Sequence, residues 1–238
     1  MTETLLTLSK ALFTKLNGMP YFRNYAAASG FQQNISKHEE AVEDVFIKYG
    51  LTTWKPIGRD KITKDTFKSW IDTPSLAIKM PSMSYVYQPC GSQDSPDFII
   101  KLAENIVLAI ECKSSDTTTP QYNSGGIKKN YIYVFCSKSV NSTTIYVGGD
   151  VMSPEQQKDI DELIEKQREL EREYNKKLQG HDIHKRGISY YTRPMICQSG
   201  GGSITDYFTH PEKAQCEKNV HLYVEAMIQA HAVPTSMS

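Results

Sequence analysis

Residues 95–115, SPDFIIKLAENIVLAIECKSS, decide the fold, because a short polar turn here joins two apolar segments. Residues 98–100 and residues 106–113 are short apolar runs of the kind that form strands, and residues 103–105 read as the turn between them. The stretch therefore predicts a β-hairpin, and the rest of the fold can be worked out around it.

Two carboxylates and one ammonium group are expected at one end of this hairpin. Side chains alternate along a strand, so Glu111 and Lys113 project from the same face, and antiparallel pairing brings Asp97 beside them. Hydrolysis of a phosphodiester requires neutralisation of a pentavalent anion and production of hydroxide, and carboxylates with bound Mg²⁺ supply both. We therefore interpret Asp97 and Glu111 as metal ligands. The cation Lys113 would position the attacking water or stabilise charge on the phosphate.

The same residues resemble a known family. Pro96-Asp97, thirteen intervening residues and Glu111-Cys112-Lys113 resemble the PD-(D/E)xK nuclease motif, and the flanking sequence is similar to that of type II restriction endonucleases. The resemblance implies a mixed sheet flanked by helices and Mg²⁺ as the cofactor. It also implies cleavage of double-stranded DNA that leaves 5′-phosphate and 3′-hydroxyl ends.

The resemblance also implies roles for single residues. Its specific part covers about residues 92–137. Within that part, Asp97 and Glu111 correspond to metal ligands, the main-chain carbonyl of Cys112 to another ligand, and Lys113 to the catalytic lysine.

Many members of this family place a further glutamate on the helix before the hairpin. Here Glu39, Glu40 and Glu43 compete for that role, and Glu39 is favoured because it lies three residues before Val42, near the inward face of the helix. Ser36 followed by Glu39 also matches a capping box. Glu39 therefore has a structural interpretation beside the catalytic one.

The remaining sequence predicts an α/β fold in which a mixed central sheet is flanked by helices. Residues 131–135 are apolar on both faces, which is typical of a central strand, and residues 143–147 predict another strand. Apolar spacing of the helical period marks four helices, which cover the first 18 residues, residues 36–49, residues 154–178 and residues 217–230.

Length and composition indicate one globular domain. The 238 residues are 39% hydrophobic and 23% charged. We expect a catalytic core over about residues 34–178 and a C-terminal helical part that contacts DNA over about residues 180–232. The five scattered cysteines lack zinc or disulfide spacing, and Lys10 and Lys15 interrupt the apolar N-terminus. These features predict a soluble, cytoplasmic protein without a membrane partner.

Two polar segments are candidates for DNA contacts, although both also fit ordinary surface loops. One covers residues 114–130, directly after Lys113, and the other covers residues 180–202, where basic and aromatic side chains interleave. We expect Asn123 to read adenine and Lys128 to contact guanine or phosphate. The candidate DNA-binding residues are Asn123, Ser124, Lys128, Lys129, Lys185, Arg186, Arg193 and Gln198.

Charge is balanced overall but segregated along the chain. Lys and Arg together number 27, as do Asp and Glu, which argues against a protein that merely coats nucleic acid. Residues 155–173 carry eight acids and four bases, whereas residues 174–196 carry five bases and one acid. Loops that face phosphate would give this pattern, and so would a solvated helix with a basic end.

These features favour a type II restriction endonuclease that acts as a homodimer. A two-fold DNA target is matched by a two-fold protein, and the N-terminal helix and the helix over residues 155–178 are both candidate interfaces. The alternatives are a structure-specific repair or recombination nuclease of the same fold and a non-catalytic DNA-binding module. The intact set of Asp97, Glu111 and Lys113 argues against the non-catalytic module.

Overall fold

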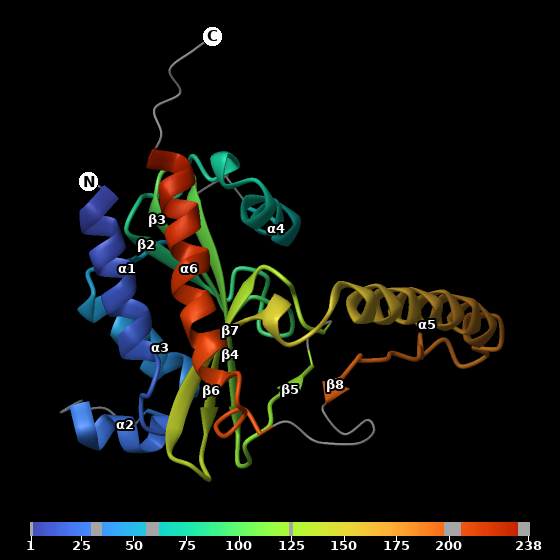
Figure 1. Ribbon diagram of the computed structural model, residues 1–238. Coiled ribbons are helices and arrows are strands. Elements are labelled where there is room, and N and C mark those ends of the chain that lie inside the picture. Colours follow the sequence, from blue (N-terminus) through green and yellow to red (C-terminus); the bar gives the residue numbers. More distant parts are fainter. Residues whose placement is uncertain (1, 30–34, 56–61, 124–125, 198–205, 233–238) are drawn as a thin grey trace.

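The computed structural model describes residues 2–29, 35–55, 62–123, 126–197 and 206–232 (Figure 1). Among these residues, six strands form a mixed sheet in the order β1-β2-β3-β4-β6-β7. The strands are β1 (Thr52–Thr53), β2 (Ser84–Tyr87), β3 (Phe98–Ala103), β4 (Ile106–Ser115), β6 (Tyr131–Ser137) and β7 (Ser142–Val147). The prediction of an α/β fold with a mixed sheet and flanking helices is confirmed.

The predicted hairpin lies at the centre of this sheet. β3 and β4 pair antiparallel, with Phe98 opposite Ile110, and Asn105 in the turn takes a φ of 60°. β6 pairs parallel with β4 and antiparallel with β7, and all its residues are buried. The prediction that residues 131–135 form an interior strand is therefore confirmed. A strand that is apolar on both faces is expected to be covered on both.

Helices cover one face of the sheet because their apolar residues fall on single sides (Figure 1). The helices on this face are α1 (Thr2–Leu16), α2 (Phe22–Ser29), α3 (His38–Lys48) and α6 (Lys213–Ala232). Val220, Val224 and Ile228 of α6 share a core with Leu12 and Leu16 of α1. The C-terminal helix α6 is thus part of this core, although it lies in the C-terminal part expected over residues 180–232.

The opposite face of the sheet carries α4 (Lys64–Asp72), the turn η1 (Pro74–Leu76) and a small two-stranded sheet. Phe67 and Trp70 of α4 pack edge to face, with ring centroids 5.1 Å apart. The small sheet pairs β5 (Gln121–Tyr122) with β8 (Ile196–Cys197).

The polar segment after Lys113 is anchored in its middle. Tyr122 is buried, and its hydroxyl group lies 2.7 Å from that of Tyr146 and 2.9 Å from that of Tyr207. The interpretation of residues 114–130 as an ordinary surface loop is therefore wrong for this part. A single apolar ring within a polar stretch gives too weak a pattern to predict such an anchor.

α5 (Pro154–Gly180) leaves the body of the molecule as a projecting helix (Figure 1). Its 27 residues rise about 40 Å. The helix begins as predicted, with Pro154 in the first turn and the Ser153 hydroxyl accepting a hydrogen bond from the Gln156 N–H at 3.2 Å. Of its residues, all of them described, Ile164 alone is buried. No helix in the described ranges has the length and apolar character needed to cross a membrane.

Candidate active site

Asp97, Glu111 and Lys113 lie together at one end of the β3–β4 pairing. The ladder between the two strands ends at Phe98 and Ile110, so the next residue on each strand carries a carboxylate. The Asp97 Oδ2 accepts a hydrogen bond from the Cys112 N–H at 2.8 Å, and the Lys113 Nζ donates to the Glu111 Oε1 at 2.7 Å. The hairpin thus brings together the three side chains that the sequence singles out.

Both carboxylates have raised pKa values. Burial, followed by the nearby charge of Glu111, raises the pKa of Asp97 to about 7. Glu111 is only 4% exposed, and this burial raises the pKa of its carboxyl group. The charge of Lys113 acts in the opposite direction but does not cancel the effect. Two buried acids at close range disfavour each other's ionised form. A cation between them would reverse that effect.

One oxygen of this pair has no hydrogen-bond partner among the described residues. It is the Glu111 Oε2, which is buried. Buried polar atoms are nearly always satisfied, so an orphaned oxygen indicates a place for an ion or a water molecule.

Asp97 and Glu111 offer carboxylate oxygens, which are donors that Mg²⁺ prefers. Within the described part of the chain, no group of three or more His, Cys, Asp or Glu side chains could hold a metal ion. Mg²⁺ is commonly held by one or two carboxylates, with water and substrate phosphate completing its shell. Asp97 and Glu111 therefore fit Mg²⁺.

Cys112 contributes main-chain atoms to this end of the hairpin. Its side chain lies in the core on the opposite face, and burial holds the pKa of its thiol well above the usual range. In a strand, the N–H and the C=O of one residue point to the same neighbour. Because the Cys112 N–H points to Asp97, its carbonyl lies on that side as well.

The upstream helix brings the charge of Glu39 to the carboxylate pair. The predicted capping box between Ser36 and Glu39 is wrong, because Glu40 accepts the hydrogen bond from the Ser36 N–H at 2.7 Å. The residue at the N-cap of α3 is Lys37, which makes Glu40 the third residue of the helix. Glu39 is thereby free of the capping role, and its charge raises the pKa of Asp97.

The other neighbours of the pair come from α3 and β2. Glu43, the remaining candidate on α3, accepts a hydrogen bond from the Tyr85 hydroxyl at 2.8 Å. Tyr87 is 37% exposed and packs on Phe98, with ring centroids 5.1 Å apart. Burial and the charge of Glu39 raise the pKa of Tyr87 to about 12. Sequence reasoning missed Tyr87, whose only signal was an aromatic ring at the end of a short apolar run.

Asn123 and Arg193 connect Lys113 to the segment that follows α5. The Lys113 Nζ lies 3.5 Å from the Asn123 Oδ1, at the long limit of a hydrogen bond. The Arg193 Nε donates to the Asn123 main-chain oxygen at 2.9 Å. Pairing of β5 with β8 brings these residues together across a long stretch of sequence. The prediction that Asn123 reads a base did not include this contact with Lys113.

Lys128 and Lys129 line a groove beside the carboxylate pair. Tyr131 lines the same groove, and its pKa is raised mainly by burial and to a lesser extent by nearby groups that include Glu111. The groove has four bases and four acids, so its charge is mixed. They are Lys68, Lys128, Lys129, Arg168, Asp72, Asp94, Asp161 and Glu165.

Two further candidate DNA contacts, Lys185 and Arg186, are not brought to this site. Lys185 and Arg186 are exposed just beyond the outer end of α5, where Asp182 accepts a hydrogen bond from the Arg186 N–H at 3.0 Å. Ser124 and Gln198 lie outside the described residues.

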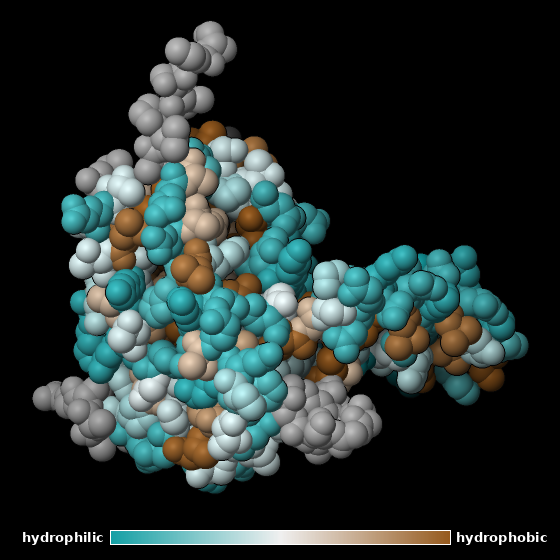
Figure 2. All heavy atoms as spheres, in the orientation of Figure 1, coloured by the Kyte–Doolittle hydropathy of each residue, from teal (hydrophilic) through white to brown (hydrophobic). Residues whose placement is uncertain are grey.

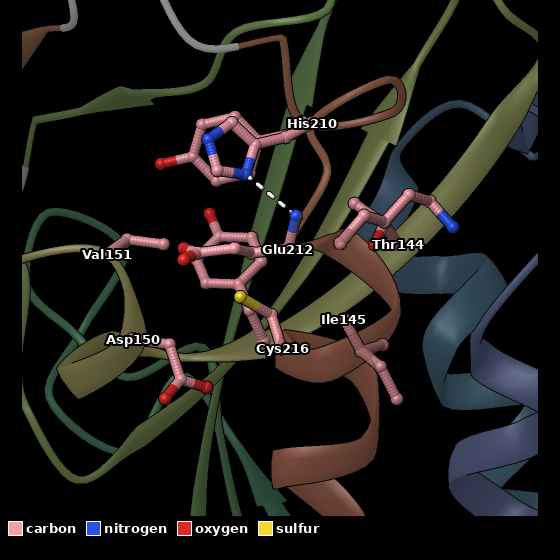
Figure 3. A pocket seen from close by; sticks show the side chains of 10 residues that line it. Thr144, Ile145, Asp150, Val151, His210, Glu212 and Cys216 are labelled. Atoms are coloured by element: carbon pink, nitrogen blue, oxygen red, sulfur yellow. Dashed lines mark hydrogen bonds between the residues drawn. The ribbon is translucent and has the colours of Figure 1, made fainter.

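A separate pocket lies between β7 and the start of α6 (Figure 3). The His210 Nδ1 accepts a hydrogen bond from the Glu212 N–H at 3.2 Å, and burial raises the pKa of the Cys216 thiol. A thiol with a raised pKa is a poor nucleophile. One Asp150 oxygen accepts a hydrogen bond from Asn219 at 3.0 Å, and the other is buried without a hydrogen-bond partner among the described residues. Asp97 and Glu111 remain the stronger candidate for catalysis, because two buried carboxylates meet there beside Lys113.

No protein-family model matches this chain, and no curated protein or solved structure is significantly similar to it.

Proposed function

We propose that this protein is a Mg²⁺-dependent endonuclease of double-stranded DNA, of the type II restriction kind. The observation that carries the proposal is the meeting of two buried carboxylates, one with an orphaned oxygen, and a lysine at one end of a hairpin. Buried acids with raised pKa values cluster at functional sites. The resemblance of the motif to PD-(D/E)xK nucleases selects phosphodiester hydrolysis among the reactions that such a pair can support.

The residues of the site have two kinds of role in this proposal. Asp97, Glu111 and the Cys112 carbonyl would hold Mg²⁺, which when bound would neutralise phosphate charge and lower the pKa of a water molecule. Lys113 would orient the attacking water or stabilise the negative charge that develops on phosphate. Its side chain is only 11% exposed, so its charge acts through a medium less screening than bulk water.

The surroundings of the site are compatible with a duplex as substrate. Lys128, Lys129 and Arg168 line the adjacent groove and are suited to phosphate contacts. The acids in the same groove would limit binding that rests on charge alone. Such mixed charge supports a sequence-selective enzyme more than a protein that coats DNA.

Digestion of several plasmids of known sequence tests the proposed function. In the presence of Mg²⁺ we expect discrete fragments whose ends map to one short sequence. Cutting confined to branched or mismatched DNA would instead identify a repair or recombination nuclease. DNA binding without any scission would identify a non-catalytic module and contradict the proposal.

Mg²⁺ binding is expected to compete with a proton at Asp97. Because its pKa is about 7, Asp97 is protonated in most molecules at pH 6 and ionised in most molecules at pH 8. The apparent Mg²⁺ affinity should therefore be about tenfold weaker at pH 6 than at pH 8. Isothermal titration of the DNA-free protein at both pH values measures this difference. Equal affinities would contradict the raised pKa.

The raised pKa of Asp97 also makes the stability of the metal-free protein depend on pH. This stability should fall as pH rises, whereas the Mg²⁺ affinity should increase. Because folding raises the pKa of Asp97, its contribution to stability is fully present below the pKa of the unfolded chain and is lost as pH rises through about 7. Asp97→Asn serves as the control for the titration. It should remove both the pH-dependent loss of stability and the stabilisation by Mg²⁺.

Glu39 and Glu40 form a matched pair of neighbours with different expected roles. Glu39→Ala should lower the cleavage rate at least about tenfold, which corresponds to about 1.4 kcal/mol, and leave stability nearly unchanged. Glu40→Ala should cost about 1 kcal/mol of stability, because it removes the cap of α3, and leave cleavage nearly unchanged. Single-turnover cleavage and urea denaturation of both variants measure the two effects. The reverse pattern would assign the catalytic role to Glu40.

A further inference from the structure

The region that projects from the body, residues 154–197 and hereafter the arm, exposes an unusual amount of apolar surface. It carries nine of the fifteen large hydrophobic side chains that are exposed among the described residues. In the view of Figure 2, hydrophobic side chains gather along the lower part of the arm, below a hydrophilic upper part. Contiguous exposed apolar surface of this kind marks a site of protein association.

The apolar residues of α5 form a stripe. Leu163, Gln167, Leu170 and Tyr174 follow one another at the alternating spacing of four and three residues that is typical of a coiled-coil seam. Leu178 extends the stripe by one more turn. The four apolar side chains are between 40% and 56% exposed, so the body of the protein does not cover them.

The surface of the arm is preformed. After α5 the chain returns along the helix, and Asn175 binds both main-chain groups of Tyr190, with distances of 2.6 and 2.8 Å. Glu171 accepts hydrogen bonds from the N–H and the hydroxyl of Thr192 at 3.2 and 2.5 Å. Tyr190 and Leu163 line the same groove. A surface already held in place loses little conformational entropy when a partner binds.

The charges on the arm select a second copy of the chain as the partner. Residues 155–165 carry five acids and one base, whereas residues 176–186 carry four bases and one acid. A two-fold axis across two antiparallel helices sets each acidic segment against the basic segment of the other copy. The formal net charge of zero adds no repulsion between copies. DNA fits this surface less well, because its phosphates gain little from apolar side chains.

We propose that the arm is the surface on which two copies of this chain associate, with antiparallel α5 helices and Leu170 near the two-fold axis. Leu170 is assigned to the axis because it lies at the middle of the stripe between Leu163 and Leu178. The N-terminal helix, the other interface that the sequence leaves open, buries Leu12 and Leu16 in the core of its own chain.

The association itself does not depend on the nuclease assignment, whereas its functional meaning rests on the proposed function. The arm is continuous with the active site, because Arg193 at its inner end binds the main chain of Asn123 beside Lys113. Two copies joined through their arms would present two active sites to one duplex.

Light scattering of the full chain without DNA tests the association. The wild-type protein is expected at twice 26.9 kDa, and Leu170→Glu is expected at 26.9 kDa, with dimer affinity lowered at least about tenfold. Gln179→Glu is the matched control. It adds the same charge nine residues further along, on the opposite side of the helix, and should remain dimeric. Glutamate is a good helix former, so neither change should unfold α5.

A cysteine at the axis provides a second test that adds no charge. Leu170→Cys is expected to form a disulfide-linked dimer under oxidising conditions, while the wild-type chain, which controls for the native cysteines, is not. A wild-type protein that stays monomeric, or a Leu170→Glu variant that stays dimeric, would overturn the proposal. If the Leu170→Glu variant stays dimeric and also binds duplex DNA more weakly than the wild type, the arm is a DNA-binding surface and not a dimer interface. A dimer that does not cut DNA would contradict only the proposed function.

Discussion

Glu111→Gln is expected to lower the rate of Mg²⁺-dependent DNA cleavage by about 100-fold to 1,000-fold. The amide has almost the same shape as the carboxylate, but it supplies no negative charge to the cation and no ionic partner to Lys113, which lies 2.7 Å from the Glu111 Oε1. The magnitude follows from the loss of one group that acts on transition-state charge, about 2.7–4 kcal/mol. Single-turnover cleavage of a labelled duplex at saturating enzyme measures it.

Two companion variants sharpen this prediction. Lys113→Met should show a loss of the same order, because it keeps the length of the side chain but removes the ammonium group. Glu104→Gln makes the identical chemical change at an exposed position in the turn of the same hairpin, so its cleavage should remain at the wild-type rate. DNA binding measured in Ca²⁺ should be retained in all three. Wild-type cleavage by Glu111→Gln would contradict the assignment of the site.

Phe98→Ala is expected to destabilise the protein by about 3–5 kcal/mol. Phe98 is fully buried, and its ring packs edge to face on Phe46, with centroids 5.1 Å apart, and on Tyr85, with centroids 6.0 Å apart. Truncation would leave a cavity where β3 meets α3, directly beside Asp97. Urea denaturation of the metal-free protein measures the change in the free energy of unfolding.

Phe98→Leu is the control for this core substitution. Because leucine fills most of the space, its cost should stay below about 1.5 kcal/mol. A cost below about 1 kcal/mol for Phe98→Ala would mean that the aromatic contacts of Phe98 do not hold β3 against α3. In that case the placement of Asp97 would need another explanation.

The central part of the site could be predicted from sequence because it depends on local geometry. Strand alternation alone puts Glu111 and Lys113 on one face, and a short turn limits the pairing register that brings Asp97 beside them. The cap of α3 could not be predicted as reliably. Glu39 and Glu40 are neighbours, so a shift of one residue in the helix start exchanges their roles.

Contacts between distant segments account for most of what the sequence did not reveal. Asn123 meets Lys113 and Arg193 because β5 pairs with β8, and no local pattern reports such a pairing. Likewise, the apolar periodicity of α5 shows that Leu163 and Leu170 share a side, but it does not say what that side contacts. In the structure most of that side is exposed on the arm.

Strand scission of a mixed-sequence supercoiled plasmid by the purified wild-type protein, measured in Mg²⁺ and in EDTA, tests the proposed nuclease activity most directly. We expect double-strand cuts in Mg²⁺ alone, with 5′-phosphate and 3′-hydroxyl ends that a DNA ligase can rejoin. Cutting that continues in EDTA, or intact plasmid in Mg²⁺ despite a folded protein that binds DNA, would contradict the claim that Asp97, Glu111 and Lys113 form a Mg²⁺-dependent nuclease site.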